Sequence, residues 1–190
     1  MNFPILSTLI FLPLLSSLFI FLSRDKKNHN SIYISLFSSI ATFLLSLFLW
    51  YSLDNNSAEF QFVEEKSWIN NYTKFKLGVD GISILFIVLT TFITPICIIS
   101  CINSIKTRVK EFLIAILILE TFMIGVFCSL DLVIFYLFFE AGLIPMFLII
   151  GVWGGPRRVY SAFKFFLFTL LGSVLMLVAI IVIYLSLIHI

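Results

Sequence analysis

Residues 135–147 read FYLFFEAGLIPMF, a run of apolar side chains that surrounds one carboxylic acid, Glu140. Such a run is suited to the interior of a bilayer or to a buried core, and the rest of the chain decides between the two. In a bilayer, an ionised carboxylate at this position costs roughly 2.5–3.5 kcal/mol on insertion scales. The acid therefore needs either a structural partner or a chemical function.

The composition of the whole chain indicates a bilayer. Of its 190 residues, 61% are hydrophobic and 12% are charged, whereas soluble domains are about 25% charged. The net charge of +2 is small and the basic residues form short clusters between apolar runs, so we expect no nucleic-acid partner. The three cysteines lie inside apolar runs without the spacing of a metal or redox centre. The sequence predicts an integral membrane protein.

Six stretches are long and apolar enough to cross a bilayer as helices, which takes about 20 residues each. They are residues 3–23, 31–53, 81–103, 112–129, 132–152 and 160–188. The first is interpreted as a retained helix, because no Arg-rich leader precedes it and no convincing cleavage site ends it. The sequence therefore predicts an all-α membrane protein in which residues 1–190 form a single transmembrane domain.

Residues 54–79, between the second and third spans, form the only polar segment of any size. Within it, residues 59–62 and 74–77 alternate between polar and apolar side chains, which predicts two short strands of a hairpin. Trp68 and Tyr72 are expected at the membrane interface, where aromatic side chains are enriched.

The charges of the loops predict the membrane face of each loop. The loops after the first, third and fifth spans share one face and hold eight cations, Arg24, Lys26, Lys27, Lys106, Arg108, Lys110, Arg157 and Arg158. The loop at 54–79 holds three, Lys66, Lys74 and Lys76. By the positive-inside rule, the N-terminus and the 54–79 loop face the intermembrane or periplasmic side.

Two acids lie deep inside predicted spans. Glu120 is midway along the fourth span and Glu140 is near the middle of the fifth, so both carboxyls are expected close to the bilayer midplane. Ionisable groups inside a membrane are functional candidates by default, and a buried carboxyl can serve in proton exchange. For each acid, a structural hydrogen bond to a neighbouring helix is the alternative.

The surroundings of Glu140 add two features. Pro145 leaves the carbonyl of Ala141 without its intrahelical partner, and Gly142 gives room for water or a second helix. Lys164 lies near the start of the sixth span, where its side chain either extends to the interface or serves as a partner that tunes Glu140. Glu140, Glu120 and Lys164 are therefore the candidates for proton translocation.

Two further acids stand at predicted helix starts. Asp131 precedes the fifth span and Asp80 precedes the third. Aspartate is a preferred N-cap residue, so both are interpreted as helix caps, and a role of Asp131 in a proton relay is the less favoured alternative.

The longest motifs are LGVDGIS (77–83), ILETFMIGVFCSLDLVIFYLFFEAGLIPMFLIIGVWGG (118–155) and SAFKFFLFTLLGSVLML (161–177). In these stretches the chain resembles chain 4 of NADH:ubiquinone oxidoreductase, respiratory complex I, as found in alphaproteobacteria and protist mitochondria. The resemblance covers essentially the whole chain. It implies the N-terminal portion of an antiporter-like, proton-translocating subunit of the membrane arm. Glu140 matches the family's essential fifth-helix acid, which pairs with a lysine on a later, broken helix.

The resemblance also implies the molecular setting. The chain would be a subunit of an H⁺-translocating NADH:ubiquinone reductase and carry out no redox chemistry itself. Flavin, iron–sulfur clusters and quinone are expected on other subunits, so no cofactor is expected on this chain. The expected partners are lipids and other membrane-arm subunits, in the mitochondrial inner membrane or, alternatively, a bacterial plasma membrane.

Family members continue beyond the sixth helix. We therefore expect a split subunit, rather than a truncated product, whose C-terminal half lies on a second chain and supplies the lysine. Two other functions stay open. One is a subunit of a multisubunit cation/proton antiporter, and the other is a non-pumping remnant that scaffolds the arm. The pumped ion, proton or sodium, is left open as well.

Overall fold

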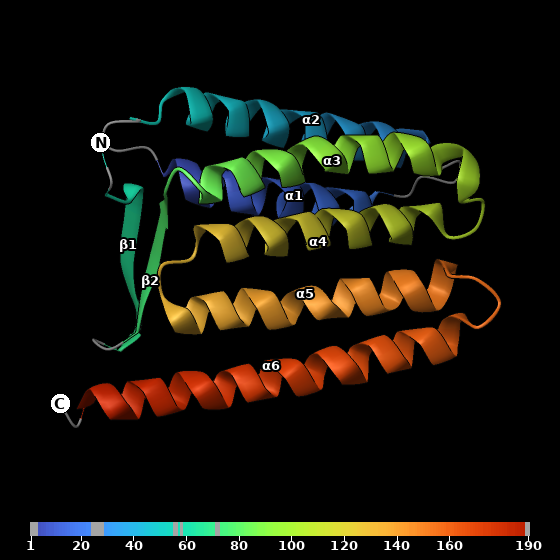
Figure 1. Ribbon diagram of the computed structural model, residues 1–190. Helices are drawn as coiled ribbons and strands as arrows, with labels where there is room; N and C mark the ends of the chain where they lie inside the picture. The colour runs from blue at the N-terminus through green and yellow to red at the C-terminus, as the bar shows by residue number, and fades with distance from the viewer. Residues whose placement is uncertain (1–3, 24–28, 55–56, 58, 71–72, 189–190) are drawn as a thin grey trace.

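A computed structural model shows a bundle of helices with a β-hairpin across one end (Figure 1). It describes residues 4–23, 29–54, 57, 59–70 and 73–188, without the side chains of 67–70, 73, 74, 103, 187 and 188. Within these ranges the helices are α1 (Ile5–Leu22), α2 (His29–Tyr51), α3 (Ser83–Ser104), α4 (Val109–Cys128), α5 (Leu132–Trp153) and α6 (Arg158–Ile188). All six are long and apolar enough to cross a membrane, which confirms the six predicted spans to within a few residues.

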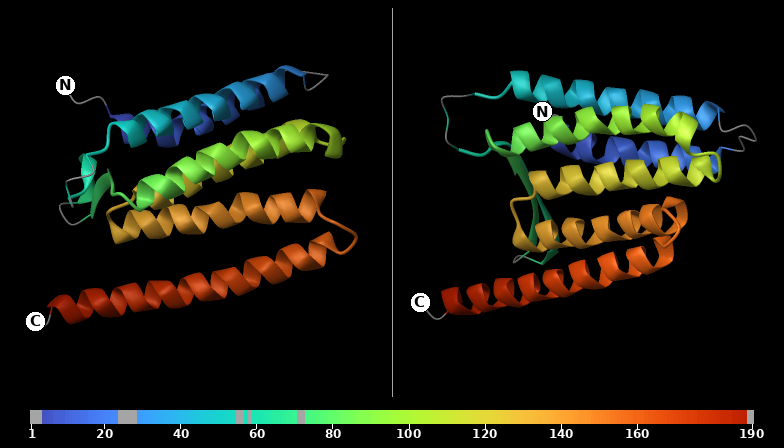
Figure 2. Two further views of the ribbon diagram at one scale, coloured as in Figure 1. Left: turned by 45° about the horizontal axis from the view of Figure 1, so that its top comes forward. Right: turned by 45° about the vertical axis from the view of Figure 1, so that its right-hand side comes forward.

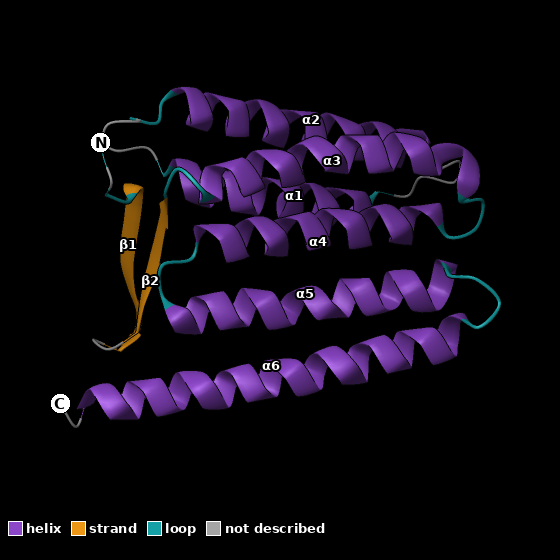
Figure 3. Cartoon of the chain, in the orientation of Figure 1, coloured by secondary structure: helices purple, strands orange, loops and turns teal. Residues whose placement is uncertain are grey.

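The predicted hairpin is present and longer than expected. Strands β1 (Gln61–Asn70) and β2 (Thr73–Val79) pair antiparallel (Figure 3). The register shifts between Gln61 and Glu64, where Phe62 adopts a left-handed φ of 53°. This irregularity is a β-bulge, which bends a strand and increases its twist. Tyr72 and the side chain of Trp68 lie outside the described residues, as do Arg24, Lys26 and Lys27.

The helices pack as a group of four, α1 to α4, with α5 and α6 added in turn on one side. Helices α1 to α4 pack against one another, α5 packs on α4, and α6 packs on α5 (Figure 2). Because α6 forms the outer edge, only 6% of its apolar stretch is buried, against 50% for α4. One whole side of α6 is therefore available to lipid or to further helices.

Helix α2 distributes its polar and apolar side chains in the opposite way to a surface helix of a soluble protein. With the exception of Leu49, all of its buried side chains carry a hydroxyl, namely Ser31, Ser35, Ser38, Ser39, Thr42 and Ser46. Its exposed side chains are large and apolar and include Tyr33, Phe37, Leu44 and Phe48. Small residues at helix interfaces let helix backbones approach closely in a membrane, while the apolar side contacts lipid.

An apolar cluster fills the bundle at the hairpin end. It is built from the first turns of α1 and α3, the last turns of α2 and α4, strand β2 and the start of α5. Its buried members are Leu6, Leu9, Ile10, Leu49, Leu77, Val79, Ile84, Ile87, Ile124, Cys128, Ile134 and Phe138. This cluster separates the middle of the bundle from the membrane face that carries the hairpin.

Charged side chains from distant parts of the chain cap both ends of α1. At its N-terminus the Glu64 carboxylate accepts hydrogen bonds from the backbone N–H groups of Leu6 and Ser7, at 2.8 and 3.1 Å, and from the Ser7 hydroxyl. At its C-terminus the Lys110 ammonium donates to the carbonyls of Phe21 and Ser23, at 3.0 and 2.6 Å. Both charges also complement the helix dipole.

We expect Glu64→Ala to destabilise the fold, because it removes the N-terminal cap of α1 and the main polar link between α1 and the hairpin. Loss of a helix cap lowers the free energy of unfolding by about 0.5–2 kcal/mol. Thermal unfolding in detergent measures the change. Glu59→Ala is the matched control, because Glu59 is exposed in the same loop. Equal effects of the two variants would contradict the cap.

Asp80 stands just before α3, outside the spanning segments, and its predicted role as a cap is confirmed. The Ser83 N–H donates to Asp80 Oδ1 at 2.7 Å, and the Asp80 N–H donates to the Ser83 hydroxyl at 2.9 Å. This reciprocal pair resembles a capping box. The backbone N–H of Ser83 is the main cause that lowers the pKa of Asp80 below its usual value.

The lowered pKa predicts a pH dependence of stability. The charged form of Asp80 stabilises the native state above the usual carboxyl pKa, and this stabilisation is lost as the pH falls through the lowered value. We expect Asp80→Asn to cost about 1 kcal/mol at neutral pH, because it weakens a charge-assisted hydrogen bond. The difference should shrink in acid. Thermal unfolding of both proteins across pH tests this, and a difference that grows in acid would contradict it.

Candidate functional site

Glu120 is buried among α2, α3 and α4. Its side chain is 2% exposed, and Thr42 of α2 donates a hydrogen bond to its Oε1 at 3.0 Å. Its Oε2 is buried and has no hydrogen-bond partner among the described residues. The carboxyl also lines a groove of about 390 Å³ between α3, α4 and α5, together with Thr94, Met123 and Met146. One oxygen is therefore satisfied and the other is not.

The Thr42 hydroxyl has several acceptors for its single hydrogen. Besides Glu120, the carbonyl oxygens of Ser39 and Ser38 lie 2.9 and 3.2 Å from its Oγ1. When Thr42 donates to Ser39, its oxygen can accept from a protonated Glu120. The same contact thus suits both protonation states of the acid.

Glu140 lies on another side of the bundle. It projects from the middle of α5 into a groove of about 460 Å³ between α5 and α6, lined also by Tyr136, Ala141, Ile144 and Phe166. Its Oε2 is buried and has no hydrogen-bond partner among the residues that the structure describes. The described walls of the groove are almost entirely apolar, so the described residues offer the acid little to pair with.

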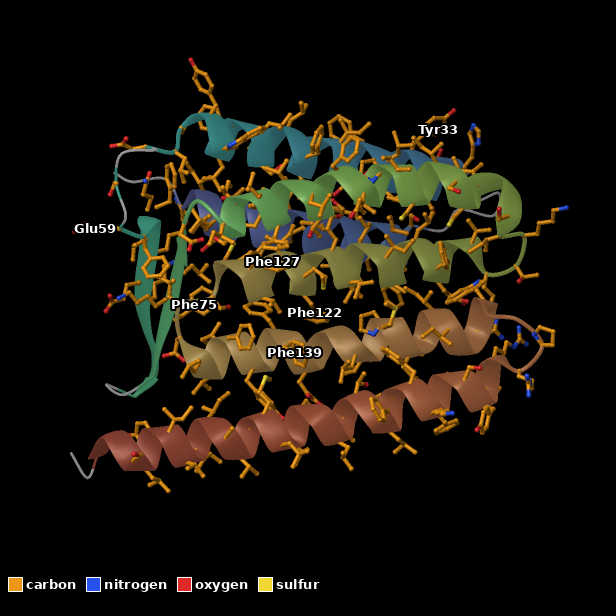
Figure 4. All side chains as sticks on the ribbon, viewed as in Figure 1. Tyr33, Glu59, Phe75, Phe122, Phe127 and Phe139 are labelled. Atoms are coloured by element: carbon orange, nitrogen blue, oxygen red, sulfur yellow. The ribbon has the colours of Figure 1, made fainter. Side chains whose placement is uncertain are left out.

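An apolar interface between α4 and α5 separates the two acids. Phe122, labelled in Figure 4, projects from α4 toward α5, and its ring centroid lies 6.4 Å from that of Phe138. Gly125 allows the close approach of the two helices, because a Cβ at this position would lie 2.6 Å from the Phe138 ring. Glu120 faces α2 and α3, whereas Glu140 faces α6. The two carboxyls are therefore not brought together.

Lys164 lines a third cavity. It is exposed on α6 beside Arg157, Tyr160 and Ser161, in a cavity of about 740 Å³. Its Nζ lies 6.0 Å from the centre of the Tyr160 ring. Lys164 is not among the described residues that line the groove of Glu140. The three predicted candidates therefore occupy three separate places in the described part of the chain.

Asp131 is the N-cap of α5, as predicted. Its Oδ1 accepts from the N–H groups of Val133 and Ile134 at 2.8 and 3.3 Å. Prediction from the sequence missed the hydroxyl groups of α2, among them Thr42, the partner of Glu120. Their helical spacing was a visible signal, since hydroxyls recur every three or four residues from Ser31 to Ser46.

Together, the six spans, the hairpin and the two intramembrane acids define a polytopic membrane protein with an antiporter-like fold. Residues 129–187 match the family described as "NADH:quinone oxidoreductase/Mrp antiporter, TM". This segment contains Glu140, Pro145 and Lys164. The fold and the resemblance seen in the motifs are thus supported by an independent match.

Individual relatives that the chain resembles are subunits of NADH-quinone and NADH-ubiquinone oxidoreductases. The chain is 53% identical over 184 residues to NADH-quinone oxidoreductase subunit M of Rhodobacter capsulatus, covering 95% of this chain and 36% of the relative. It is 51% identical over 181 residues to NADH-ubiquinone oxidoreductase chain 4 of Marchantia polymorpha, covering 94% and 37%. These matches confirm the resemblance, and the chain spans little more than a third of the length of these relatives.

Two solved structures have folds similar to that of this chain. A chain of respiratory complex I from Thermus thermophilus with bound NADH superposes with a TM-score of 0.78 at 26% identity, covering 93% of this chain and 35% of that one. A chain of the archaeal membrane-bound sulfane sulfur reductase gives a TM-score of 0.77 at 22% identity, covering 98% and 28%. The second likeness concerns the fold alone.

Substitution of the two glycines tests the close packing of α4 on α5. A Cβ at Gly125 would lie 2.6 Å from the ring of buried Phe138, whereas one at Gly142 would meet Phe122 at 3.7 Å, an ordinary contact. We expect Gly125→Ala to destabilise by about 1–3 kcal/mol through overpacking. Gly142→Ala should be neutral or slightly stabilising, since alanine favours helices. Thermal unfolding in detergent compares them, and equal melting temperatures would contradict this packing.

Proposed function

We propose that the chain is part of the membrane arm of a proton-pumping NADH:quinone oxidoreductase and that Glu140 exchanges protons there. One observation carries the proposal. In the FFEAGLIPM segment, a carboxyl in the middle of a membrane span directs an oxygen without a described partner into an apolar groove. About half of the residues are identical to subunits M and 4 of such complexes, which supports the same assignment.

The groove determines what Glu140 can do. An unpaired carboxylate is costly in an apolar environment, so the ionised acid requires a cation or water close by. A proton taken up on the carboxylate removes this cost, and a cation that approaches later favours its release. Glu140 can therefore alternate between an acid and a carboxylate as its surroundings change, which is the elementary step of a proton pump.

Further helices supply those surroundings in this proposal. Glu140 opens toward α6, and α6 is exposed along most of its length. Other membrane-arm subunits and lipids cover this side. A lysine on a helix beyond the six described here pairs with Glu140. A native complex in which every helix is resolved and no such lysine approaches Glu140 would contradict this pairing.

The redox chemistry lies elsewhere in the assembly. Flavin, iron–sulfur clusters and quinone bind to other subunits, and this chain binds no cofactor. It is thus a subunit of a reductase whose own contribution is the movement of protons. Glu120 and Lys164 belong to the same function as further proton-carrying candidates.

The location follows from the same assignment. The chain lies in the mitochondrial inner membrane or, for a bacterial source, in the plasma membrane. The described cations at the end opposite the hairpin are Lys106, Arg108, Lys110, Arg157 and Arg158, which supports a matrix or cytoplasmic position for that end. The N-terminus and the hairpin then face the intermembrane or periplasmic side.

Two alternatives have less support. A subunit of a cation/proton antiporter shares the fold, and the description of the matching family includes both classes. The relatives at about half identity are subunits of NADH:quinone oxidoreductases, however, which favours the respiratory complex. A non-pumping remnant would have no reason to keep acids in the middle of two spans at the cost of burying them.

Glu140→Gln tests the proposed role of the acid. Glutamine keeps the shape and the hydrogen-bonding capacity but cannot titrate. We expect normal assembly and a loss of proton translocation of about tenfold or more, as for removal of an essential proton-transfer group. NADH:quinone turnover should fall with it in a coupled pump. Both are measured in membranes and normalised to assembled complex.

The control for this variant is Glu111→Gln. Glu111 is an exposed acid in the first turn of α4 that forms a surface ion pair of 3.8 Å with Arg108, and such pairs contribute about 0–1 kcal/mol. Its loss should leave both activities unchanged. Glu140→Asp should keep partial function. Near-normal pumping in Glu140→Gln would contradict the proton-exchange role and indicate that Glu140 is a structural hydrogen-bonding residue.

A further inference from the structure

The buried face of α2 forms a line of hydroxyl groups. It starts where α2 leaves the α1–α2 loop and ends in the middle of the bundle, and its members are Ser31, Ser35, Ser38, Ser39 and Thr42. Residues three and four apart lie above one another on a helix, so consecutive hydroxyls are neighbours. All five are buried. We call this line the hydroxyl ladder.

The hydroxyls of the ladder keep capacity for further hydrogen bonds. Ser35 and Ser39 donate to the carbonyls of Ile32 and Leu36 at 2.9 and 3.0 Å, which leaves the lone pairs of both oxygens as acceptors. Ser38 Oγ is buried without a hydrogen-bond partner among the described residues. The oxygens of these hydroxyls can therefore accept further hydrogen bonds along the helix.

The ladder ends at Glu120. Thr42 donates to one carboxyl oxygen, and the other oxygen is buried and unpartnered in the described chain. Because the Thr42 hydroxyl has the Ser39 carbonyl as a second acceptor at 2.9 Å, it can turn from donor to acceptor toward Glu120. That reversal is what a hydroxyl needs in order to pass a proton.

The route closes beyond Glu120. Ser46 and Thr91 bond to each other at 2.7 Å. From there to the hairpin, the described core of the bundle is the apolar cluster, which includes Leu49, Ile84 and Ile87. The polar groups thus reach the midplane from one membrane face and not from the other.

We propose that Glu120 is a second proton-exchanging acid, loaded from the membrane face of the α1–α2 loop along the hydroxyl ladder and closed to the hairpin face. A proton from water at that face passes through bound waters and hydroxyls, each of which accepts one proton and gives up its own. The net result is one proton on Oε1 of Glu120, the oxygen that Thr42 contacts, and the carboxylate becomes a carboxylic acid. The return of the proton reverses the sequence.

The inference rests on the proposed function and extends it to a different part of the chain. Glu140 opens toward α6, whereas the ladder runs through α2 on the other side of the α4–α5 interface. The plain alternative is that the serines are small residues that let helices pack. Close packing alone does not explain why the line ends at a carboxyl with an unpartnered oxygen.

Few titratable groups face Glu120. The hydroxyl of Thr42 approaches from α2, and Thr94, Cys97 and Cys101 line its groove from α3. From α5 the groove receives Met146 and Ile149. Among the described residues that line this groove, the two thiols are thus the other titratable side chains, and none is a cation.

Carbodiimide labelling tests the sidedness. A hydrophobic carbodiimide dissolves in the bilayer, reaches Glu120 through the apolar groove and reacts with protonated carboxyls. The intact assembly is labelled briefly in sealed vesicles while the pH is raised on one side, and mass spectrometry gives the occupancy at Glu120. We expect severalfold less labelling when the α1–α2 loop side is made alkaline, and no change when the hairpin side is. Labelling of Glu120 that depends on the pH of the hairpin side, of both sides or of neither side would overturn the proposal.

Matched variants test the ladder. Thr42→Val keeps the shape and removes the hydroxyl, so the response of Glu120 labelling to pH should slow by about tenfold or more. Thr121→Val is the control, since Thr121 is a buried threonine beside Glu120 on α4 that bonds to the Leu117 carbonyl. Equal slowing in both variants would overturn the ladder. Ser38→Ala against Ser17→Ala repeats the test with smaller changes, should the valine variants fail to assemble.

The labelling assay needs no turnover, so it separates this inference from the proposed function. If Glu140→Gln abolishes pumping and the labelling of Glu120 does not depend on the pH of the α1–α2 loop side, the hydroxyl ladder is wrong and the proposed function stands. If labelling follows the loop side and Glu140→Gln pumps normally, the role of Glu140 is wrong. Proton pumping that is also lost in Glu120→Gln, with assembly intact, would support both roles.

Discussion

The absence of water from the hydrocarbon core of a bilayer determines this structure. A buried polar group that finds no partner in lipid costs several kcal/mol, so the backbone forms helices and the polar side chains turn inward. Helix α2 shows this most clearly, because its serine and threonine hydroxyls are buried whereas Phe37 and Phe48 are exposed. Serine and threonine tolerate that position because they can donate to the carbonyl three or four residues earlier in their own helix.

The same constraint explains the ends of the helices, where backbone groups lose their intrahelical partners. Asp131 caps α5 within its own segment, and Asp80 bonds reciprocally with Ser83 at the start of α3. Helix α1 has no local side-chain cap at its N-terminus, and it receives Glu64 and Lys110 from distant parts of the chain. Because Glu64 lies on β1, its hydrogen bonds to the N–H groups in the first turn of α1 also hold the hairpin across the end of the bundle.

Local signals in the sequence were enough to predict the elements. Long apolar runs predicted the six spans, alternation predicted the hairpin, and aspartates before apolar runs predicted two caps. Partners that are distant in sequence were not predictable, because no local pattern links Thr42 to Glu120 or Glu64 to α1. The depth of Glu120 and Glu140 could be counted along their helices, but the side that each faces depends on how α4 and α5 pack. The contacts of Phe122, Gly125 and Phe138 at the apolar α4–α5 interface determine that packing.

The two acids consequently differ in what they require. Glu120 has its hydroxyl partner on α2 and lines a groove between α3, α4 and α5, so described residues of this chain surround it. Glu140 faces a groove whose other wall is α6, and α6 is open on its far side. Whatever packs against α6 therefore influences Glu140 strongly and Glu120 weakly, since the apolar α4–α5 interface lies between them. A chain built in this way can keep one acid in equilibrium with one membrane face while the other responds to the assembly around it.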